Sequence, residues 1–295
     1  MMRIAVFGIC QAYSYAHALA HLLPDAEVQA FQASLVRGEG RIAEVADLLT
    51  GFDAVLTQRF SADEMEALAT PALLARCPRI VMVPTVVFTG YQPDVVLLPH
   101  EGKLLASPVG SYHSAIAAAG FSLGLPEYDV QNLFNRLVYA RLGYFEEFVR
   151  ARDFLLASIT ECGLPLEAGT FDAWHRRGPF MLTMNHPCIF VFATLARAAA
   201  IQLGLLDAAV PTPELRFDPL AIDTIWPVYP ELAEALGVPG DLLFKRQTAL
   251  TQPIGNMACL PLPAFLRESF AMYRDYPVQA FEAEDVIRVR RVLAG

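Results

Sequence analysis

RIAVFG, residues 3–8, is the stretch that decides the fold class. It is a continuous apolar run that ends in Gly8, and the segment 13–23 that follows carries apolar side chains at helical spacing until Pro24. A short apolar run bounded by glycine indicates a buried strand, and an apolar stripe that stops at proline indicates a helix. The chain therefore begins with a strand, a turn and a helix, and Cys10 lies in that turn.

The same alternation continues along the first third of the chain. Short apolar runs predict further strands at residues 27–32, 54–57 and 79–83, and helical spacing predicts helices at 41–49 and 62–75. Strands that alternate with helices in this way are typical of an α/β fold with a mainly parallel sheet, flanking helices and a Rossmann-like core. Active sites of such folds gather at the carboxyl ends of the strands.

The remaining chain is predicted to hold a helical insertion and the completion of the core. Residues 85–110 are rich in Pro and Gly, which predicts an ordered loop over the sheet edge. We expect residues 1–110 to form the first part of the α/β core, 111–165 a helical insertion, and 166–295 the completion of the core with C-terminal helices. In the last part we expect a strand at 180–183 and helices at 189–203, 231–236 and 264–275.

The amino-acid composition limits which kinds of molecule the protein is expected to bind. The 295 residues are 55% hydrophobic, and 22 Lys and Arg against 31 Asp and Glu leave a net charge of −9, which disfavours nucleic acid. The most apolar window, 188–206, contains Arg197, so a buried helix is favoured over a membrane span. The start, MMRIAVFGICQAY, lacks the long apolar core of a signal peptide, and we expect a cytoplasmic protein.

The cysteines point away from disulfides and metals. Their number is odd and no C-x-x-C pair occurs, which favours free thiols in a reducing compartment and no metal site. They are Cys10, Cys77, Cys162, Cys188 and Cys259.

Cys10 and His186 are the residues that best suit nucleophilic chemistry. At a strand-to-helix turn, backbone N–H groups and the positive helix end stabilise a thiolate or an oxyanion. His186, in Asn185-His186-Pro187 after a predicted strand, suits a general base for that thiol. The alternative interpretation is that Cys10 is a small buried packing residue.

Four further polar residues are candidates near predicted strand ends. Gln11, Gln58 and Tyr91 are placed to donate hydrogen bonds to an oxyanion or a sugar hydroxyl, although Gln58 and Tyr91 taken alone are typical of solvated loops. Asp94 either orients His186 as the third member of a triad or caps the following segment, and capping is favoured.

Two other sets of residues complete the candidates. His113 is a rival to His186 as the base. No G-x-G-x-x-G phosphate loop occurs, so a nucleotide-type ligand would need scattered cations, although most exposed cations are only solvated surface. Those candidates are Lys103, Arg136, Arg141, Arg176, Arg177, Lys245 and Arg246, with the first three preferred as cofactor contacts.

Five short segments in order resemble the WcbI-type polysaccharide biosynthesis family. They are GICQAYSYAHAL (8–19), AVLTQRF (54–60), PTVVFTGYQPD (84–94), GSYHSAI (110–116) and MNHP (184–187), the last followed by an apolar helix. The resemblance spans residues 3–205, and the last 90 or so residues contribute little. The turn at Cys10 is also similar to the nucleophile position of SGNH-type esterases and acetyltransferases, where serine takes that place.

The resemblance implies an α/β enzyme that takes coenzyme A or acetyl-CoA as cosubstrate and acetylates a carbohydrate acceptor during capsule or exopolysaccharide assembly. It also implies that the cysteine of the GxCQ motif, here Cys10, is catalytic. Ile9 departs from the family pattern, in which asparagine usually holds this place.

These observations lead to one hypothesis and two alternatives. In the hypothesis, His186 activates Cys10 or the acceptor, Gln11, Gln58 and the first-helix amides stabilise the oxyanion, and the acceptor is bound by Gln58, Tyr91, Asp94, Asn185 and His113. The alternatives are a thiol-dependent esterase or deacetylase, and a non-catalytic protein that binds a carbohydrate or an acyl carrier. The sequence leaves the oligomeric state open, a homo-oligomer included.

Overall fold

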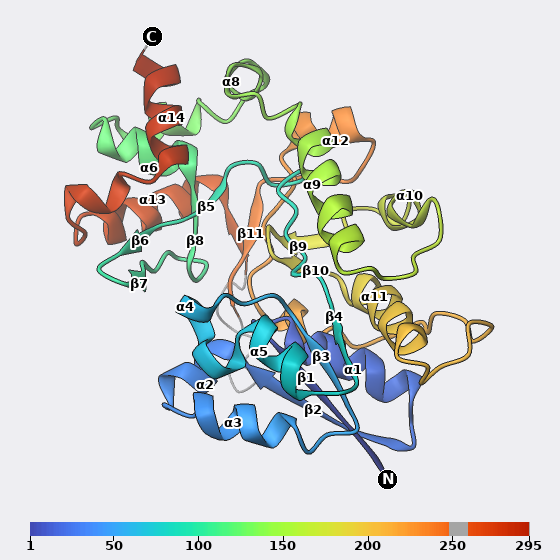
Figure 1. The fold of residues 1–295 in the computed structure, drawn as a ribbon. Coiled ribbons are helices and arrows are strands. Elements are labelled where there is room, and N and C mark those ends of the chain that lie inside the picture. The colour runs from blue at the N-terminus through green and yellow to red at the C-terminus, as the bar shows by residue number, and fades with distance from the viewer. Residues whose placement is uncertain (248–258, 295) are drawn as a thin grey trace. The chain divides into compact units, whose positions relative to one another are not determined.

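The computed structural model of the chain describes residues 1–247 and 259–294, and Figure 1 shows its helices and strands. These residues form two compact units, each built from several stretches of chain. Unit 1 comprises residues 1–87, 154–180 and 185–220, and unit 2 comprises the described residues of 88–153, 181–184 and 221–295.

A parallel sheet forms the centre of unit 1. It has four strands in the order β2-β1-β3-β4. They are β1 (Met2–Gly8), β2 (Ala26–Gln32), β3 (Ala54–Thr57) and β4 (Ile80–Met82). In β1, Ile4 lies opposite Val28 of β2 and Ala54 of β3. A strand covered on both faces must be apolar throughout, and Ile4, Ala5, Val6 and Phe7 are all fully buried.

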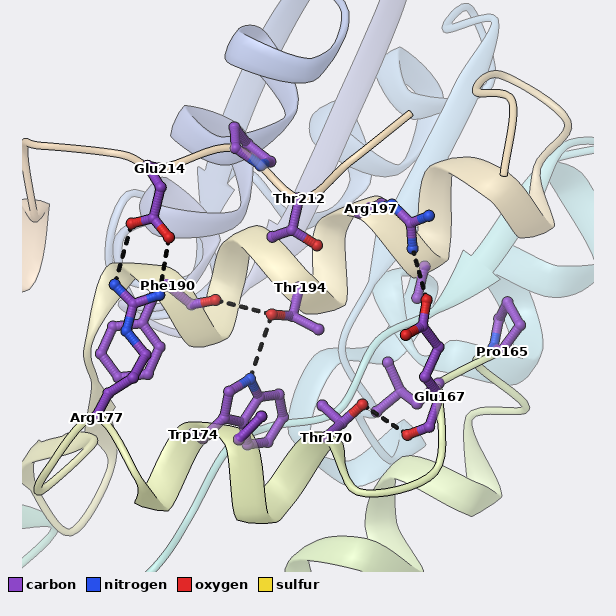
Figure 2. A pocket seen from close by; sticks show the side chains of 14 residues that line it. Pro165, Glu167, Thr170, Trp174, Arg177, Phe190, Thr194, Arg197, Thr212 and Glu214 are labelled. Carbon is purple, nitrogen blue, oxygen red and sulfur yellow. Dashed lines mark hydrogen bonds and ion pairs between the residues drawn. The ribbon is translucent and has the colours of Figure 1, made fainter. Parts of the chain in front are cut away.

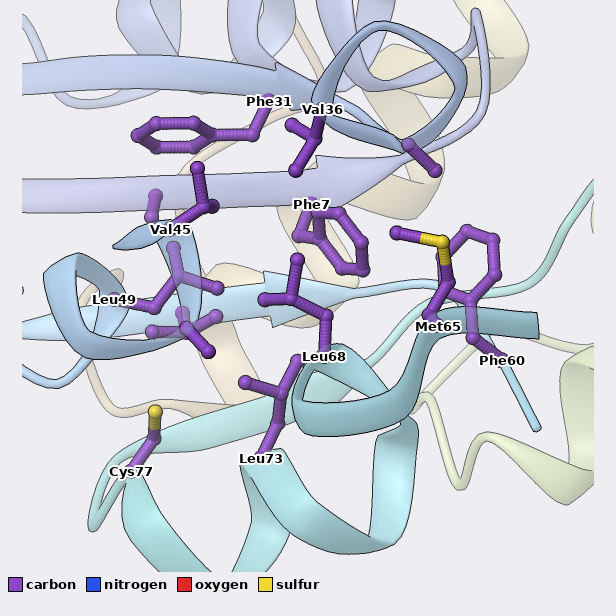
Figure 3. Packing of buried hydrophobic residues seen from close by; sticks show 14 of the residues in the cluster. Phe7, Phe31, Val36, Val45, Leu49, Phe60, Met65, Leu68, Leu73 and Cys77 are labelled. Atoms are coloured by element: carbon purple, nitrogen blue, oxygen red, sulfur yellow. The ribbon is translucent and has the colours of Figure 1, made fainter. Parts of the chain in front are cut away.

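Several short helices cover one face of this sheet. They are α2 (Ala33–Gly38), α3 (Ile42–Leu49), α4 (Ala62–Met65), η1 (Glu66–Leu68) and α5 (Thr70–Arg76). Figure 3 shows the core beneath them, in which Phe7 of β1 belongs to one cluster with Val45, Leu49, Leu68 and Leu73. Side chains alternate across a strand, so Ala5 and Phe7 face this cluster and Ile4 and Val6 face the other side.

Two longer helices, α1 (Ala12–Leu22) and α11 (Ile189–Gln202), are the second helical layer of unit 1. Helix α1 contacts β1, β2 and α11, and α11 contacts β4. The ring of Tyr15 on α1 meets that of Phe192 on α11 edge-on at 4.9 Å between centroids. Unit 1 also includes α10 (Thr170–His175), β10 (His186–Pro187) and the part of α9 (Glu147–Glu161) from Phe154 onward.

Unit 2 is built from short antiparallel pairs and helices. Strand β5 (Val95–Leu97) pairs with β8 (Tyr112–Ser114), β6 (Pro99–His100) with β7 (Lys103–Leu104), and β11 (Leu243–Lys245) with β12 (Cys259–Pro261). Its other elements are α6 (Ala115–Ser122), α7 (Glu127–Gln131), α8 (Arg136–Leu142), β9 (Met181–Thr183), α12 (Pro230–Leu236), α13 (Leu262–Tyr273), η3 (Val278–Phe281) and α14 (Glu284–Ala294). Helix α6 contacts α7, α13 and α14. A further short helix, η2 (Pro219–Ile222), lies where the chain passes from unit 1 to unit 2.

The predicted α/β class with a parallel sheet and flanking helices is confirmed. The prediction of an irregular loop over residues 85–110 was incomplete, because β5, β6 and β7 lie within it. Strands of two or three residues are too short to show a period in the sequence. The division of the chain at residues 110 and 165 remains a prediction. Among the residues that the structure describes, no helix is both long and apolar enough to cross a membrane.

Candidate active site

Cys10 lies between the carboxyl end of β1 and the start of α1, in the turn predicted for it. The thiol-bearing residue is partly exposed. Gln11 follows at the N-cap position of α1, and its side chain does not cap the helix. No side-chain oxygen of the N-cap residue therefore compensates the positive end of the α1 dipole. This helix end favours a negative charge placed next to it.

His186 is the residue that meets the Cys10 thiol. The Cys10 Sγ and His186 Nε2 atoms are 3.5 Å apart, although 176 positions separate the residues in the chain. His186 is buried, with 3% of its surface exposed, and lies just before Cys188, the N-cap of α11. The rings of Tyr15 and Phe192 are in contact, and each lies a similar number of residues along the chain after Cys10 and His186 respectively. Helices α1 and α11 therefore run in the same direction, and their first residues lie close together.

Gln58 fixes the backbone of the Cys10 turn from the end of the neighbouring strand β3. Its Oε1 accepts a hydrogen bond from the Ile9 N–H at 2.8 Å. Its Nε2 donates to Gln11 Oε1 at 2.8 Å and to the Pro84 carbonyl at 3.3 Å. Gly8 makes this approach possible, because a Cβ at position 8 would lie 2.4 Å from Gln58 Oε1.

Gln11 connects this turn to the segment that carries His186. Its Nε2 donates to the Asn185 carbonyl and to the Val86 carbonyl, both at 2.8 Å, and its Oε1 accepts from the Val86 N–H at 3.0 Å and from Gln58. Both N–H groups and both lone pairs of the amide are thus used inside the protein. The side chain has no N–H left for an oxyanion, in contrast to the predicted role, and instead positions Asn185 next to Cys10.

Asp94 is a helix-capping residue of unit 2. Its fully buried carboxylate accepts from the Ile116 N–H at 2.9 Å, which belongs to the first turn of α6, and from the hydroxyls of Tyr144 at 3.0 Å and Tyr229 at 2.7 Å. Burial raises the pKa of Asp94 to about 6. The capping role expected for Asp94 is present, although the helix it caps begins at Ala115 and does not follow directly. These partners occupy both carboxylate oxygens of Asp94. The structure therefore shows Asp94 as a capping residue and not as the third member of a catalytic triad.

The other two candidates of unit 2 with buried side chains are also packed into its interior. His113 is fully buried, its Nδ1 lies 3.1 Å from the Tyr273 hydroxyl, and its Nε2 lies 3.2 Å from the Leu105 carbonyl. Burial lowers the pKa of His113 to about 4, so the ring is neutral at pH 7. The fully buried ring of Tyr91 packs at 5.2 Å from Phe88 and 5.6 Å from Phe148. Roles for these residues in acceptor binding stay predictions.

The predicted cofactor cations are exposed residues of unit 2. Lys103 lies on β7, and Arg136 and Arg141 lie on α8. Arg136 forms an ion pair with Glu234 and lies over the Phe145 ring. Five residues along a helix correspond to a rotation of about 140°, so Arg136 and Arg141 do not converge on one point. Their role also stays a prediction.

All five cysteines are free thiols. Burial raises the pKa of Cys77, and it raises that of Cys162 to about 11 and that of Cys188 to about 12. Such thiols are poor nucleophiles near neutral pH. Within residues 1–247 and 259–294, no group of three His, Cys, Asp or Glu side chains could hold a metal ion.

A family model and a solved structure match this chain. The model of the polysaccharide biosynthesis enzyme WcbI matches residues 3–208. The chain belongs to the WcbI family. It is thus a member of a family of polysaccharide biosynthesis enzymes, as the sequence motifs predicted. No curated protein sequence matches it significantly.

The solved structure is one of WcbI, described as a novel polysaccharide biosynthesis enzyme. It matches 100% of this chain and 95% of its own, with a TM-score of 0.66 and 17% sequence identity. It is described as the native protein without a disulfide bond between coenzyme A and a cysteine. At this identity the likeness shows the shared fold alone.

Residues from most of the WcbI-type motifs meet around Cys10 in unit 1. Four of the five segments contribute to the hydrogen bonds around Cys10. GICQ supplies Cys10 and Gln11, TQRF supplies Gln58, PTVVF supplies Val86, and MNHP supplies Asn185 and His186. Ile9 takes part through its backbone N–H, while its side chain packs against the hydrophobic cluster of Figure 3. The departure at Ile9 therefore leaves these hydrogen bonds intact.

Some contributors to the WcbI-family site could not be identified from the sequence. Tyr15 donates from its hydroxyl to the Pro84 carbonyl at 2.9 Å, and the Val86 backbone binds Gln11. A cavity of about 340 Å³ lies beside this segment, at the carboxyl ends of β3 and β4. Its lining is mainly apolar and includes Val83, Val87 and Phe154. In the sequence, one signal for this arrangement is the position of Gly8 at the end of an apolar run, because a glycine there lets another side chain approach the backbone closely.

Proposed function

We propose that this WcbI-family enzyme transfers an acetyl group from acetyl-CoA to a carbohydrate hydroxyl in capsule or exopolysaccharide biosynthesis. The observation that carries the proposal is the 3.5 Å contact between the Cys10 thiol and the His186 imidazole at the start of α1. A thiol next to an imidazole and a helix N-terminus is a typical activated nucleophile. The association of coenzyme A with a cysteine in the description of a related structure supports the choice of donor.

The reaction proceeds in two steps. In the first, His186 Nε2 accepts the Cys10 proton, and the thiolate attacks the acetyl carbonyl carbon. A new C–S bond forms to Cys10 while the C–S bond of the donor breaks, and the free CoA thiol leaves with the proton from His186. In the second, His186 takes the proton of the acceptor hydroxyl while the hydroxyl oxygen attacks the carbonyl carbon of acetyl-Cys10. A C–O bond forms, the C–S bond to Cys10 breaks, and the Cys10 sulfur regains its proton from His186 as the ester leaves.

The surroundings of the pair suit this chemistry. Backbone N–H groups at the start of α1 other than those of Ala12 and Ser14, which donate to the Ile9 and Gln11 carbonyls, are the proposed oxyanion donors, since the Gln11 and Gln58 side chains hold the backbone instead. The mainly apolar cavity at the carboxyl ends of β3 and β4 suits the pantetheine arm of acetyl-CoA. Lys103, Arg136 and Arg141 remain the proposed contacts for its phosphates. Five free thiols suit a reducing compartment, and we assign the reaction to the cytoplasm.

The test combines binding, transfer and mass measurement. Wild-type protein should bind acetyl-CoA by calorimetry and gain the mass of one acetyl group on Cys10 in the absence of acceptor. Cys10→Ala should abolish this labelling, and His186→Asn should slow transfer by about 100-fold or more. Cys259→Ser changes a partly exposed thiol outside the site and is the matched control.

Three outcomes would contradict the proposal. Full transfer activity in both Cys10→Ala and His186→Asn would exclude these residues from the reaction. Steady release of acetate that no carbohydrate acceptor diverts would identify a thiol-dependent hydrolase. Absence of binding to both acetyl-CoA and CoA would favour a protein that binds carbohydrate without catalysis.

A further inference from the structure

A second cavity lies in unit 1, between α10 and α11, and has a volume of about 220 Å³ (Figure 2). Helix α11 contributes Phe190, Thr194, Arg197 and Ala198, which recur at helical spacing and so share one face. Phe192, which packs against Tyr15 of α1, points to the opposite face. The second cavity is therefore separated from the Cys10 side of α11.

Arg197 is a rigidly held cation at one end of this cavity. Its Nε and Nη2 donate to the carbonyls of Val210 and Ala208, both at 2.5 Å. Its Nη1 faces only the Glu167 carboxylate among the residues described, at 3.9 Å, which is beyond hydrogen-bond range. The Arg197 side chain is 15% exposed and that of Glu167 is 84% exposed. A preorganised, largely buried guanidinium thus has an exposed counter-charge that does not hydrogen-bond to it.

The other walls offer hydroxyls and aromatic surface. Thr194 Oγ1 accepts from Trp174 Nε1 at 3.2 Å and donates to the Phe190 carbonyl at 3.0 Å. Thr170 and Thr212 line the same space, and Figure 2 shows Thr194 and Thr212 between the two arginines.

The arginine at the opposite end differs from Arg197. Arg177 is bound by both oxygens of Glu214 at 3.1 Å and lies 4.2 Å from the centre of the Phe190 ring. Its charge is therefore already compensated, so Arg197 is the cation of this cavity that a ligand would use.

We propose that this cavity binds one acidic sugar unit, a hexuronate or a sugar of the same chemistry, as part of a polysaccharide chain. The ligand carboxylate displaces Glu167 and accepts one hydrogen bond from Arg197 Nη1 and one from the second N–H of Nη2, a two-pronged geometry that guanidinium groups favour. Sugar hydroxyls bind the threonine hydroxyls, and the apolar edge of the ring lies along the aromatic wall.

The size of the cavity supports one sugar unit. A volume of about 220 Å³ is smaller than the roughly 300–1,000 Å³ of sites for drug-sized ligands, so a whole acetyl-CoA molecule does not fit. The site is independent of Cys10 chemistry and depends only on the family's role in polysaccharide biosynthesis.

The chain offers a built-in optical probe for the test. Trp174 lines the cavity, and Trp226 is the only other tryptophan of the sequence. In a Trp226→Phe background, titration with glucuronate should therefore change the fluorescence of Trp174 in a saturable way. Glucose, which carries a CH2OH group in place of the carboxylate, and acetate, which has the carboxylate alone, should bind at least about tenfold more weakly. Calorimetry on the unmodified protein gives the same comparison without relying on the tryptophan variant.

Substitutions in the cavity separate ligand binding from structure. Arg197→Met should weaken glucuronate binding at least about tenfold, and Arg197→Lys, which keeps the charge, should weaken it less. Glu167→Gln removes the competing carboxylate and should tighten binding by up to about fivefold. No saturable response to glucuronate, equal affinity for glucose or acetate, or weaker binding in Glu167→Gln would each overturn the proposal. Acetyl transfer from acetyl-CoA onto Cys10 should be unaffected by Glu167→Gln, so failure here is distinct from failure of the proposed reaction.

Discussion

Gly8 is the residue on which the geometry of the Cys10 turn most depends. It precedes Ile9 and Cys10, and the Gln58 amide lies in the space where its Cβ would be. That amide is held at both ends, by the Ile9 N–H and by Gln11 and Pro84, so it has no room to retreat without losing hydrogen bonds. The absence of a side chain at position 8 is thus a condition for the contact between Gln58 and the turn.

Gly8→Ala is expected to displace Gln58 and release the Ile9 N–H. Loss of this partly buried hydrogen bond should cost on the order of 1 kcal/mol, so unfolding by urea should shift to lower concentration and acetylation of Cys10 should slow. Gly38→Ala is the matched control, because a Cβ at that position has no heavy atom within 4 Å. A Gly8→Ala protein with the stability and acetylation rate of Gly38→Ala would refute this account.

Among the elements of unit 2, α6 and the segment before β5 are joined through Asp94. Its carboxylate binds the first turn of α6 together with Tyr144, which follows α8, and Tyr229, the N-cap of α12. Burial without a cation raises its pKa from the usual 3.8 to about 6. The folded protein therefore keeps this proton at pH values where the unfolded chain has lost it.

Asp94 should make unit 2 less stable as the pH rises from about 4 to about 6. In this window the unfolded state binds fewer protons than the folded state, so the free energy of unfolding falls with pH, by about 3 kcal/mol at about 1.36 kcal/mol per pKa unit. Asp94→Asn removes the titration and should flatten this part of the pH profile, measured by chemical denaturation. Asp25→Asn, at an exposed position, should keep the wild-type slope. An unchanged slope in Asp94→Asn would contradict the assignment.

Elements with a clear period were predictable, and the contacts between them were not. Strand β3 was predicted at its observed bounds and β1, α1 and α11 within a residue or two, because apolar runs and stripes mark buried strands and helix faces. Helix α2 and the strands from β5 to β8 are too short for such a signal. At the site, Cys10 and His186 were predictable as residue types at strand ends. The hydrogen bonds that occupy the whole Gln11 amide were not predictable, since their partners lie 47 to 174 positions away in the sequence.

Across the whole molecule, the five thiols should differ in reactivity. Burial raises the pKa values of Cys77, Cys162 and Cys188, whereas the Cys10 thiol lies next to an imidazole. At neutral pH, iodoacetamide should therefore label Cys10 well before these three, as followed by peptide mass spectrometry. His186→Asn should slow labelling of Cys10 but not of Cys259. Labelling of Cys188 at the rate of Cys10 would show that burial does not control these thiols.

The division of unit 1 along the chain has a consequence for its synthesis. All four strands of the parallel sheet are complete at Met82, but α11 and His186 belong to the stretch that begins at residue 185, after a long segment of unit 2. At about 5–20 residues per second, a ribosome leaves one face of the sheet without α11 for on the order of 10 seconds. During this interval the nascent chain exposes apolar surface that a chaperone would recognise. An interrupted product that ends before residue 186 also carries Cys10 without His186, so such a chain should lack the proposed acetyl transfer.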